Sequence, residues 1–219
     1  MMNIPVLTID GPSGAGKGTV SRAVAKLLGW NYLDSGSIYR SLAIACMQAD
    51  ADLSDVEAVC KIAQNMQLAF DCGETLQVNL NGHNITPLLG TEATGNIASI
   101  VAAYPEVRTI LLQKQKDFQQ LPGLVADGRD MGSVVFPKAQ YKVYLTASAE
   151  ERGKRRYKQL IEKGIDANLV QITQEIEARD RRDSERATAP LMVPEGAVYL
   201  DSSSLSIQQV IDRVIDLVR

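Results

Sequence analysis

A glycine-rich segment between two strongly patterned stretches constrains this chain most. Residues 4–9 form an almost unbroken apolar run, which is typical of a strand buried on both faces of a parallel sheet. From Lys17 onward, apolar residues recur at spacings of three and four, which predicts an amphipathic helix that ends at Gly29. Residues 11–19 between them read GPSGAGKGT. The sequence therefore predicts a strand, a glycine loop and a helix in direct succession.

Apolar runs and helical patterns alternate along most of the remaining chain. Four more runs predict strands at residues 30–33, 124–126, 141–145 and 197–200. Helical spacing predicts helices at residues 35–49, 105–119, 149–163, 172–183 and 207–218. This order predicts an α/β fold of three layers, with a five-stranded parallel sheet covered by helices on both faces.

Residues 66–85 break this alternation. Leu76, Val78 and Leu80 alternate with polar residues, and turn signals stand at 71–73 and 81–82, which predicts an antiparallel hairpin. We expect residues 53–103 to form an insert on the core, built from a helix, a small sheet and a second helix.

Charge and composition exclude several classes of protein. The 219 residues include 23 Lys and Arg against 26 Asp and Glu, so a net charge of −3 gives no bulk attraction to nucleic acid or an anionic membrane. Three cysteines without a C-x-x-C pair support neither a disulfide framework nor a four-ligand zinc site, and they fit the reduced cytosol. No basic segment precedes the first apolar run, and no run approaches the roughly 20 residues of a membrane helix. We expect a cytoplasmic protein with no nucleic-acid or membrane partner.

The glycine loop has the groups needed to hold phosphate. Its glycines allow backbone conformations that let main-chain N–H groups converge on an anion, at the positive end of the following helix. Lys17 supplies a charge toward the outer phosphates, and Thr19 supplies a hydroxyl near a metal ion. The alternative is a glycine-rich turn with a surface lysine. No Asn-Lys-x-Asp motif occurs, which disfavours a GTPase switch.

Polar residues follow the predicted second strand, in the segment DSGSIYR at 34–40. The end of this strand lies at the ligand edge of an open parallel sheet. Ser35, Tyr39 and Arg40 can reach a ligand there, and Arg40 can meet a phosphate with paired donors. The alternative is a helix N-cap at Ser35 and two solvated side chains.

The predicted strand at 124–126 leads into the segment DGRDMG at 127–132. Asp127 stands where phosphate-loop enzymes have a carboxylate that orients the metal. Arg129 can hold an anion, and Asp130 can accept a hydrogen bond from an exocyclic amine. A plain turn at the strand end is the alternative, but two acids flanking an arginine exceed what a turn requires.

Two predicted helices carry many basic residues. They are Arg152, Lys154, Arg155, Arg156 and Lys158 on the first, and Arg179, Arg181, Arg182 and Arg186 on and after the second. Three interpretations apply: a solvated helix face with local ion pairs, a nucleic-acid surface, or a mobile lid that brings arginines over a transferring phosphoryl group. We favour the lid, because phosphoryl transfer depends on positive charge and water exclusion.

His83 is the only histidine, and we expect it in a loop or hairpin. A hydroxyl acceptor would benefit from a general base, whereas a phosphate with a second pKa of about 6 is already ionised near neutral pH. A site rich in arginine and poor in histidine therefore suits a nucleotide acceptor.

The chain resembles the bacterial cytidylate kinase family over nearly its whole length. The loop IDGPSGAGKGT, with Gly18 where the general pattern has Ser or Thr, is the version found in nucleoside monophosphate kinases. The segments LDSGSIYR, GLVADGRDMGSVVFP and RDRRDSERATAPL, in this order, are specific to the cytidylate branch. The resemblance implies transfer of the ATP γ-phosphoryl group to CMP or dCMP with Mg²⁺, in pyrimidine nucleotide metabolism, by a chain that we expect to be a monomer.

The resemblance also implies roles for individual residues. ATP would be held by Gly11, Pro12, Ser13, Gly14, Ala15, Gly16, Lys17, Gly18 and Thr19. The CMP phosphate and sugar would be held by Ser35, Tyr39, Arg40 and Arg129, the cytosine by Ser99, Arg108 and Asp130, and the ribose and phosphates by Arg179, Asp183 and Arg186. Lys17, Arg129 and Arg186 would be catalytic, and no protein residue is assigned as a metal ligand. Residues 53–103 correspond to the acceptor-binding insert and 151–186 to the lid, which leaves a core of residues 1–52, 104–150 and 187–219.

Two rival functions remain at this point. One is a kinase for another small acceptor on the same scaffold, such as UMP, AMP or shikimate. The other is an ATP-binding regulator or RNA-binding module that uses the basic helices without chemistry. The near-neutral charge and the lack of aromatic stacking residues beside those helices weigh against RNA.

Overall fold

The structure, a computed structural model, describes residues 4–72, 76–162 and 164–219. The chain forms two compact units. The sheet unit comprises the chain up to Leu33 together with Gln119–Arg219, and the inserted unit is Asp34–Phe118. The inserted unit thus contains the predicted insert 53–103 and extends beyond it on both sides.

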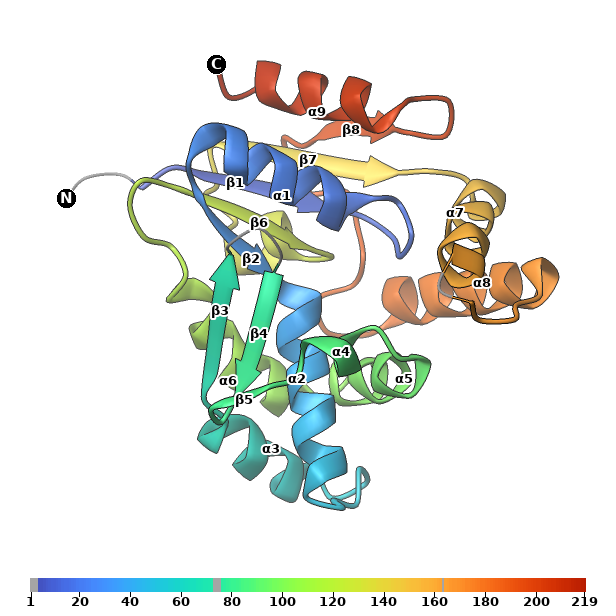
Figure 1. The fold of residues 1–219 in the computed structure, drawn as a ribbon. Helices are drawn as coiled ribbons and strands as arrows, with labels where there is room; N and C mark the ends of the chain where they lie inside the picture. Colours follow the sequence, from blue (N-terminus) through green and yellow to red (C-terminus); the bar gives the residue numbers. More distant parts are fainter. Residues whose placement is uncertain (1–3, 73–75, 163) are drawn as a thin grey trace. The chain divides into compact units, whose positions relative to one another are not determined.

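The sheet unit contains the predicted five-stranded parallel sheet (Figure 1). The strands run in the order β2-β6-β1-β7-β8, and their bounds are β1 Val6–Asp10, β2 Asn31–Asp34, β6 Leu124–Gly128, β7 Tyr141–Thr146 and β8 Val198–Asp201. Every residue of β1 and β6 is buried, which explains why both strands have near-continuous apolar sequences. All five predicted strands are confirmed to within two residues at their ends.

The central strand β1 pairs with strands that lie far along the chain. Val6 pairs with Leu124 of β6, and Leu7 pairs with Tyr141 of β7. The chain from β1 leads toward the β2 edge, whereas β7 and β8 lie on the other side of β1, so the strand order reverses at β1. Ligands of open α/β sheets bind outside the carboxyl ends of the strands at such a point.

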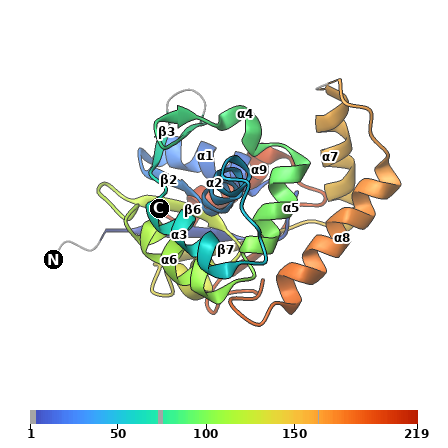
Figure 2. The ribbon, with the colours of Figure 1, turned by 90° about the horizontal axis from the view of Figure 1, so that it is seen from below.

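The helices of the sheet unit follow the predicted pattern. They are α1 Lys17–Leu28, α7 Ala149–Glu162, α8 Leu169–Glu185 and α9 Ile207–Asp216. α1 packs on β1 and β6 and against α9, while α7 and α8 pack side by side, as both views show (Figures 1 and 2). Gly29 ends α1 in the left-handed conformation, as its position after the apolar stripe predicted. A five-residue π-helix at Met131–Val135 (η1) was not predicted.

The inserted unit combines helices with a small antiparallel sheet. Its elements are α2 Ser35–Gln48, α3 Val56–Asn65, β3 Leu68–Cys72, β4 Leu76–Leu80, β5 His83–Asn84, α4 Thr86–Leu89, α5 Glu92–Val101 and α6 Pro105–Lys116. The strands β3, β4 and β5 form the predicted hairpin sheet, although its first turn lies partly outside the described residues. His83 is exposed on β5, as predicted for a hairpin residue. α5 and α3 pack against α2, and α6 packs against α3.

Candidate active site

The glycine loop adopts a conformation that only glycine supports at several positions. Gly11, Gly14 and Gly16 have φ values of 147°, 78° and 92°. A Cβ atom at Gly11 would stand 1.9 Å from the carbonyl oxygen of Leu145, so no side chain fits there. Gly16 is the N-cap of α1, which places the loop at the N-terminus of this helix. The loop therefore follows a buried strand and ends at a positive helix end, as a phosphate site requires.

Lys17 begins α1 with its side chain buried. Its Nζ donates to the carbonyl oxygen of Pro12 at 2.9 Å, within the loop. Burial lowers the pKa of Lys17 to about 8; the carboxylate of Asp127 opposes this shift and the charge of Arg129 adds to it. A buried ammonium group that has lost its hydration is suited to bind phosphate oxygens.

Asp10 was not among the predicted site residues, yet it connects two loops of the sheet unit. Its side chain is fully buried at the end of β1, and its two carboxylate oxygens accept from the backbone N–H groups of Met131 and Gly132, each at 2.8 Å. Burial raises the pKa of Asp10 to about 7, although these two hydrogen bonds act in the opposite direction. Asp10 thus fixes the segment after β6 beside the glycine loop.

Asp127 lies at the ligand edge of the sheet, where β6 nears its end. Its Oδ2 accepts from the hydroxyl of Tyr32 at 3.4 Å and lies 3.3 Å from the place that a Cβ atom would take at Gly18. Arg22 approaches the same place to 3.3 Å through Nη1. A side chain at position 18 would therefore crowd both groups, which gives a physical reason for the glycine found there.

Three arginines surround Asp183 on α8. Arg129 donates from Nε to Asp183 Oδ2, and Nη1 of Arg186 lies 4.0 Å from Asp183 Oδ1. Burial disfavours the ionised form of Asp183, but the charges of Arg129 and Arg179 outweigh it and hold the pKa of the carboxyl below its ordinary value. The charges of Arg129 and Arg179 also lower the pKa of Lys17. The structure thus brings Lys17, Arg129, Arg179 and Asp183 into one charged cluster.

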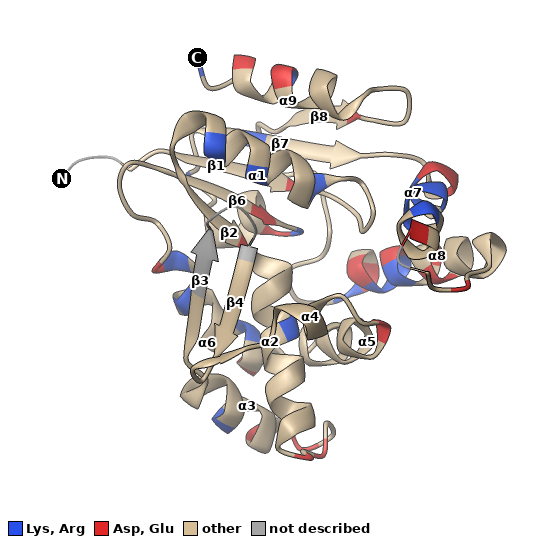
Figure 3. Cartoon of the chain, viewed as in Figure 1, with Lys and Arg blue, Asp and Glu red and all other residues tan. Residues whose placement is uncertain are grey.

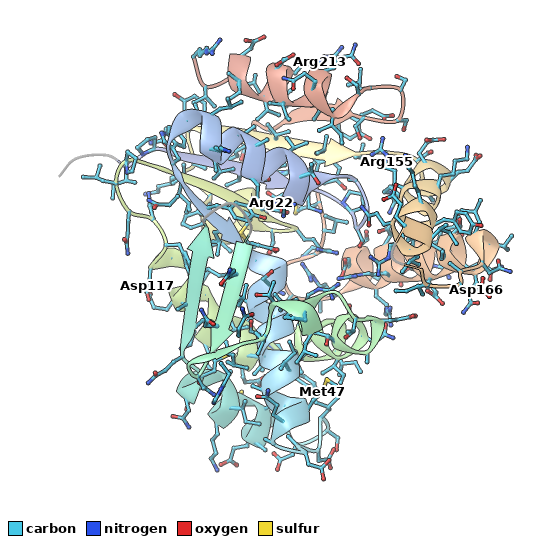
Figure 4. The ribbon with its side chains drawn as sticks, in the orientation of Figure 1. Arg22, Met47, Asp117, Arg155, Asp166 and Arg213 are labelled. Atoms are coloured by element: carbon cyan, nitrogen blue, oxygen red, sulfur yellow. The ribbon has the colours of Figure 1, made fainter. Side chains whose placement is uncertain are left out.

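Two arginines of α7 hold the glycine loop through its carbonyl oxygens. Arg152 donates to Ser13 at 3.0 Å and to Ala147 at 2.9 Å, and it pairs with Asp180 at 2.6 Å. Arg155, labelled in Figure 4, donates to the carbonyl oxygen of Ala15 at 3.4 Å and to that of Ser202 at 2.7 Å. Both residues support the backbone that would contact phosphate.

The remaining charges of α7 and α8 include both signs on each helix (Figure 3). Lys154 pairs with Glu150 and Glu151, and Arg181 and Arg182 are exposed. The solvated-face interpretation therefore holds for part of these helices, while Arg152 and Arg155 have partners in the glycine loop.

The predicted acceptor residues Ser35 and Tyr39 lie on α2 of the inserted unit. The N-cap of α2 is Asp34, whose carboxylate accepts from the backbone N–H of Ser37 at 3.0 Å, so Ser35 is not the cap. The Ser35 hydroxyl instead donates to Oε1 of Gln115 at 2.7 Å. The guanidinium carbon of Arg108 lies 5.6 Å from the ring centroid of Tyr39, in a cation–π contact.

Arg40 and Ser99 complete the predicted set in the inserted unit. Nη1 of Arg40 donates to the carbonyl oxygen of Leu89 at 2.5 Å, and a Cβ atom at Gly95 would lie 3.2 Å from Nη2. The guanidinium therefore lies flat over α5, which also carries the partly exposed Ser99. Arg40, Ser35, Tyr39 and Arg108 belong to the inserted unit, whereas Lys17, Arg129, Asp130, Arg179, Asp183 and Arg186 belong to the sheet unit.

The part of the chain that the structure describes holds no cluster of three or more His, Cys, Asp and Glu side chains that could bind a metal ion. None of its helices is both long enough and apolar enough to cross a membrane.

A glycine loop between a central parallel strand and a helix, with a buried lysine and an arginine cluster at the same sheet edge, defines a phosphate-loop nucleotide-binding protein. Comparison with known proteins narrows this class. The family model described as cytidylate kinase matches residues 7–219, and the chain belongs to this family.

Curated relatives agree with this assignment. A cytidylate kinase of Methylococcus capsulatus is 55% identical over 99% of this chain and 97% of its own. Cytidylate kinases of Colwellia psychrerythraea and Stutzerimonas stutzeri are each 51% identical, over 96% and 97% of this chain and 94% of their own. The family predicted from the sequence motifs is thereby confirmed.

Proposed function

We propose that this chain transfers the γ-phosphoryl group of ATP to CMP or dCMP, giving ADP and CDP or dCDP. The observation that carries the proposal is the near-complete match to the cytidylate kinase family, at 51–55% identity to curated members. The glycine loop and the charged cluster supply the groups that such a transfer needs.

ATP would bind at residues 11–19. The backbone N–H groups of the loop and the N-terminus of α1 would hold the phosphates, and Lys17 would neutralise the transferring group. Mg²⁺ usually takes one or two carboxylates together with phosphate oxygens, and the carboxylate of Asp127 beside Gly18 fits that need. Bound Mg²⁺ would offset negative charge on the ATP phosphates. We leave Thr19, exposed near the start of α1, as a further candidate ligand.

CMP would be held by the residues predicted for it. These are Ser35, Tyr39, Arg40, Ser99, Arg108, Arg129, Asp130, Arg179, Asp183 and Arg186. Arg40 now donates to the carbonyl oxygen of Leu89, and a nucleotide phosphate would offer it a charged acceptor instead. Residues 151–186, which include most of α7 and α8, would act as the lid.

The chemistry proposed needs no general base. The oxygen of a nucleoside monophosphate that attacks the γ-phosphorus is already ionised near neutral pH. Lys17, Arg129 and Arg186 would act by charge, and the protein by holding both nucleotides in position. We place this reaction in pyrimidine nucleotide metabolism and in the cytoplasm, whose reducing conditions suit the free thiols of Cys46 and Cys60, and we propose a monomer.

A coupled assay of ADP release tests the proposal. The purified chain with ATP and Mg²⁺ is expected to turn over CMP and dCMP with a kcat/KM well above the values for UMP and AMP. Shikimate and a reaction without acceptor serve as controls. Preferred turnover of UMP, AMP or shikimate would contradict the substrate assignment, and ADP release with none of these would contradict kinase activity.

A further inference from the structure

Gln115 is a buried polar residue of α6 that no sequence motif indicated. Its side chain is 2% exposed, and it lies within hydrogen-bond distance of two groups in the inserted unit. Nε2 donates to the carbonyl oxygen of Leu111 at 3.2 Å, and Oε1 accepts from the hydroxyl of Ser35 at 2.7 Å. Ser35 is also buried, with 4% of its surface exposed. A buried amide with both ends engaged has a fixed orientation.

The orientation of the amide follows from Leu111. The carbonyl oxygen of Leu111 can only accept, so the group of Gln115 that faces it must be Nε2. The reversed amide would bring two oxygens together without a proton between them. Oε1 therefore faces Ser35, and because an amide oxygen can only accept, the Ser35 hydroxyl must donate.

This donation determines what Ser35 can offer to a ligand. A serine hydroxyl has one proton and two lone pairs. With the proton committed to Gln115, Ser35 can only accept a hydrogen bond from a ligand. Phosphate oxygens are themselves acceptors, so they match Ser35 poorly. CMP carries three suitable donors, which are the exocyclic amine of the cytosine and the 2′- and 3′-hydroxyls of the ribose.

We propose that Gln115 is a positioning residue that makes Ser35 an acceptor for a donor group of the acceptor nucleotide. The inference rests on the proposed function and deepens it, because it separates Ser35 from the arginines that bind phosphate. It also makes the site selective for a donor: a nucleotide that presents a hydrogen-bond acceptor to Ser35 is rejected.

Gln115→Leu tests this inference, since it removes the acceptor and leaves the Ser35 proton free to turn toward a ligand. The measured quantity is kcat/KM for CMP, UMP, dCMP and 3′-deoxy-CMP. UMP has a carbonyl in place of the amine, and each deoxy analogue lacks one ribose hydroxyl. We expect the preference for CMP over one of these three to fall roughly three- to tenfold, the ratio that corresponds to one neutral hydrogen bond. The compound affected identifies the donor.

Three further variants separate positioning from structural support. Ser35→Ala should reduce the same preference, and adding Gln115→Leu to it should cause no further loss, because Gln115 acts through Ser35. Gln113→Leu is the matched control, since Gln113 is exposed on the same helix and bonds only to Asp117 (Figure 4) among the contacts resolved for its side chain. KM for ATP should stay within about twofold in the variants that fold.

Two results would overturn the inference. One is that Gln115→Leu and Ser35→Ala weaken all four nucleotides equally, which would place Ser35 on the shared phosphate. The other is that both variants lower thermal stability and leave every preference unchanged, which would make the contact purely structural. Failure of the wild-type chain to phosphorylate CMP is a different result, because it would contradict the proposed function before any variant is compared.

Discussion

Arg152 of α7 donates a hydrogen bond of 3.0 Å to the carbonyl oxygen of Ser13 in the glycine loop. The same guanidinium pairs with Asp180 of α8, so one side chain connects the loop to both helices. Its exposed fraction is 5%, and Cβ of Arg152 lies 3.1 Å from the place of a Cβ atom at Gly14. The loop conformation therefore depends on a residue far from it in sequence.

Arg152→Met is expected to raise KM for ATP about tenfold and to affect KM for CMP less, because the loop loses its support. The free energy of unfolding should also fall by roughly 3 kcal/mol, since Asp180 loses its buried partner. Arg152→Lys keeps the charge but not the planar set of donors. Its KM for ATP and its free energy of unfolding should lie between those of the wild type and Arg152→Met. Lys154→Met, on the exposed side of α7, is the control. Steady-state kinetics and urea unfolding measure both effects, and an unchanged KM for ATP would argue against loop support.

Lys17→Met should lower kcat at least 100-fold, because it removes the charge that we propose stabilises the transferring group. It should at the same time stabilise the nucleotide-free protein at pH 7, by about 1–3 kcal/mol, because burial makes the charged form of Lys17 costly. Between pH 8 and 10.5 the folded wild type binds fewer protons than the unfolded chain, so its free energy of unfolding should rise with pH there.

The slope predicted for Lys17 should be absent in Lys17→Met. Lys26→Met, on the exposed face of the same helix, provides the comparison. Thermal unfolding at pH 7 and 10 together with the coupled assay would show both effects, and near-normal turnover by Lys17→Met would refute its assigned role.

Asp10 should give the protein a pH dependence of the opposite sign. Its pKa of about 7 exceeds the value of 3.8 in the unfolded chain, so the folded protein binds more protons between these values. The contribution of Asp10 to the free energy of unfolding is therefore complete below pH 4 and is lost as the pH rises through 7. Asp10→Asn removes this slope, and one of the two N–H donors loses its acceptor. Urea unfolding should show a larger deficit for the variant at pH 5 than at pH 8.

Asp52→Asn is the control for this measurement. Hydrogen bonds from Ser54 hold the pKa of the exposed Asp52 below 3.8, so its titration lies outside the range from pH 5 to 8. The difference between wild type and Asp52→Asn should be the same at both values. An equal deficit for Asp10→Asn at pH 5 and 8 would show that Asp10 does not titrate there.

Asp130→Ala should raise KM for CMP at least tenfold and change KM for ATP by less than about threefold, because it removes the buried carboxylate that we propose accepts from the cytosine amine. The preference for CMP over UMP should fall with it. Steady-state kinetics with each substrate varied in turn gives both constants. Equal losses for the two nucleotides would contradict base recognition by Asp130.

Periodicity was sufficient to predict the five strands of the parallel sheet and their helices. In β1 and β6 both faces are buried, so the strands could be recognised as short apolar runs. Gly11 and Gly16 could be recognised because the backbone there excludes side chains. These features have local causes, and they can therefore be predicted from the residues near them in the sequence.

Other features depend on contacts between distant residues. Gln115 and Ser35 are 80 positions apart, and Asp10 is 121 positions from Met131. Neither Gln115 nor Asp10 differs in spacing from an ordinary helix residue or an ordinary acid at a strand end. The π-helix at Met131–Val135 also has a contact with a distant residue, because the N–H groups of Met131 and Gly132 donate to the carboxylate of Asp10 on β1.

The pairing of Val6 with Leu124 and of Leu7 with Tyr141 has a consequence for biosynthesis. When the ribosome has produced the first strand, neither neighbour of that strand exists, and more than a hundred further residues must be added before one does. The inserted unit, Asp34–Phe118, is contiguous and can be completed during this interval. The nascent chain must therefore shield a largely apolar strand until β6 leaves the exit tunnel, and slower elongation through the inserted unit would lengthen its exposure to aggregation.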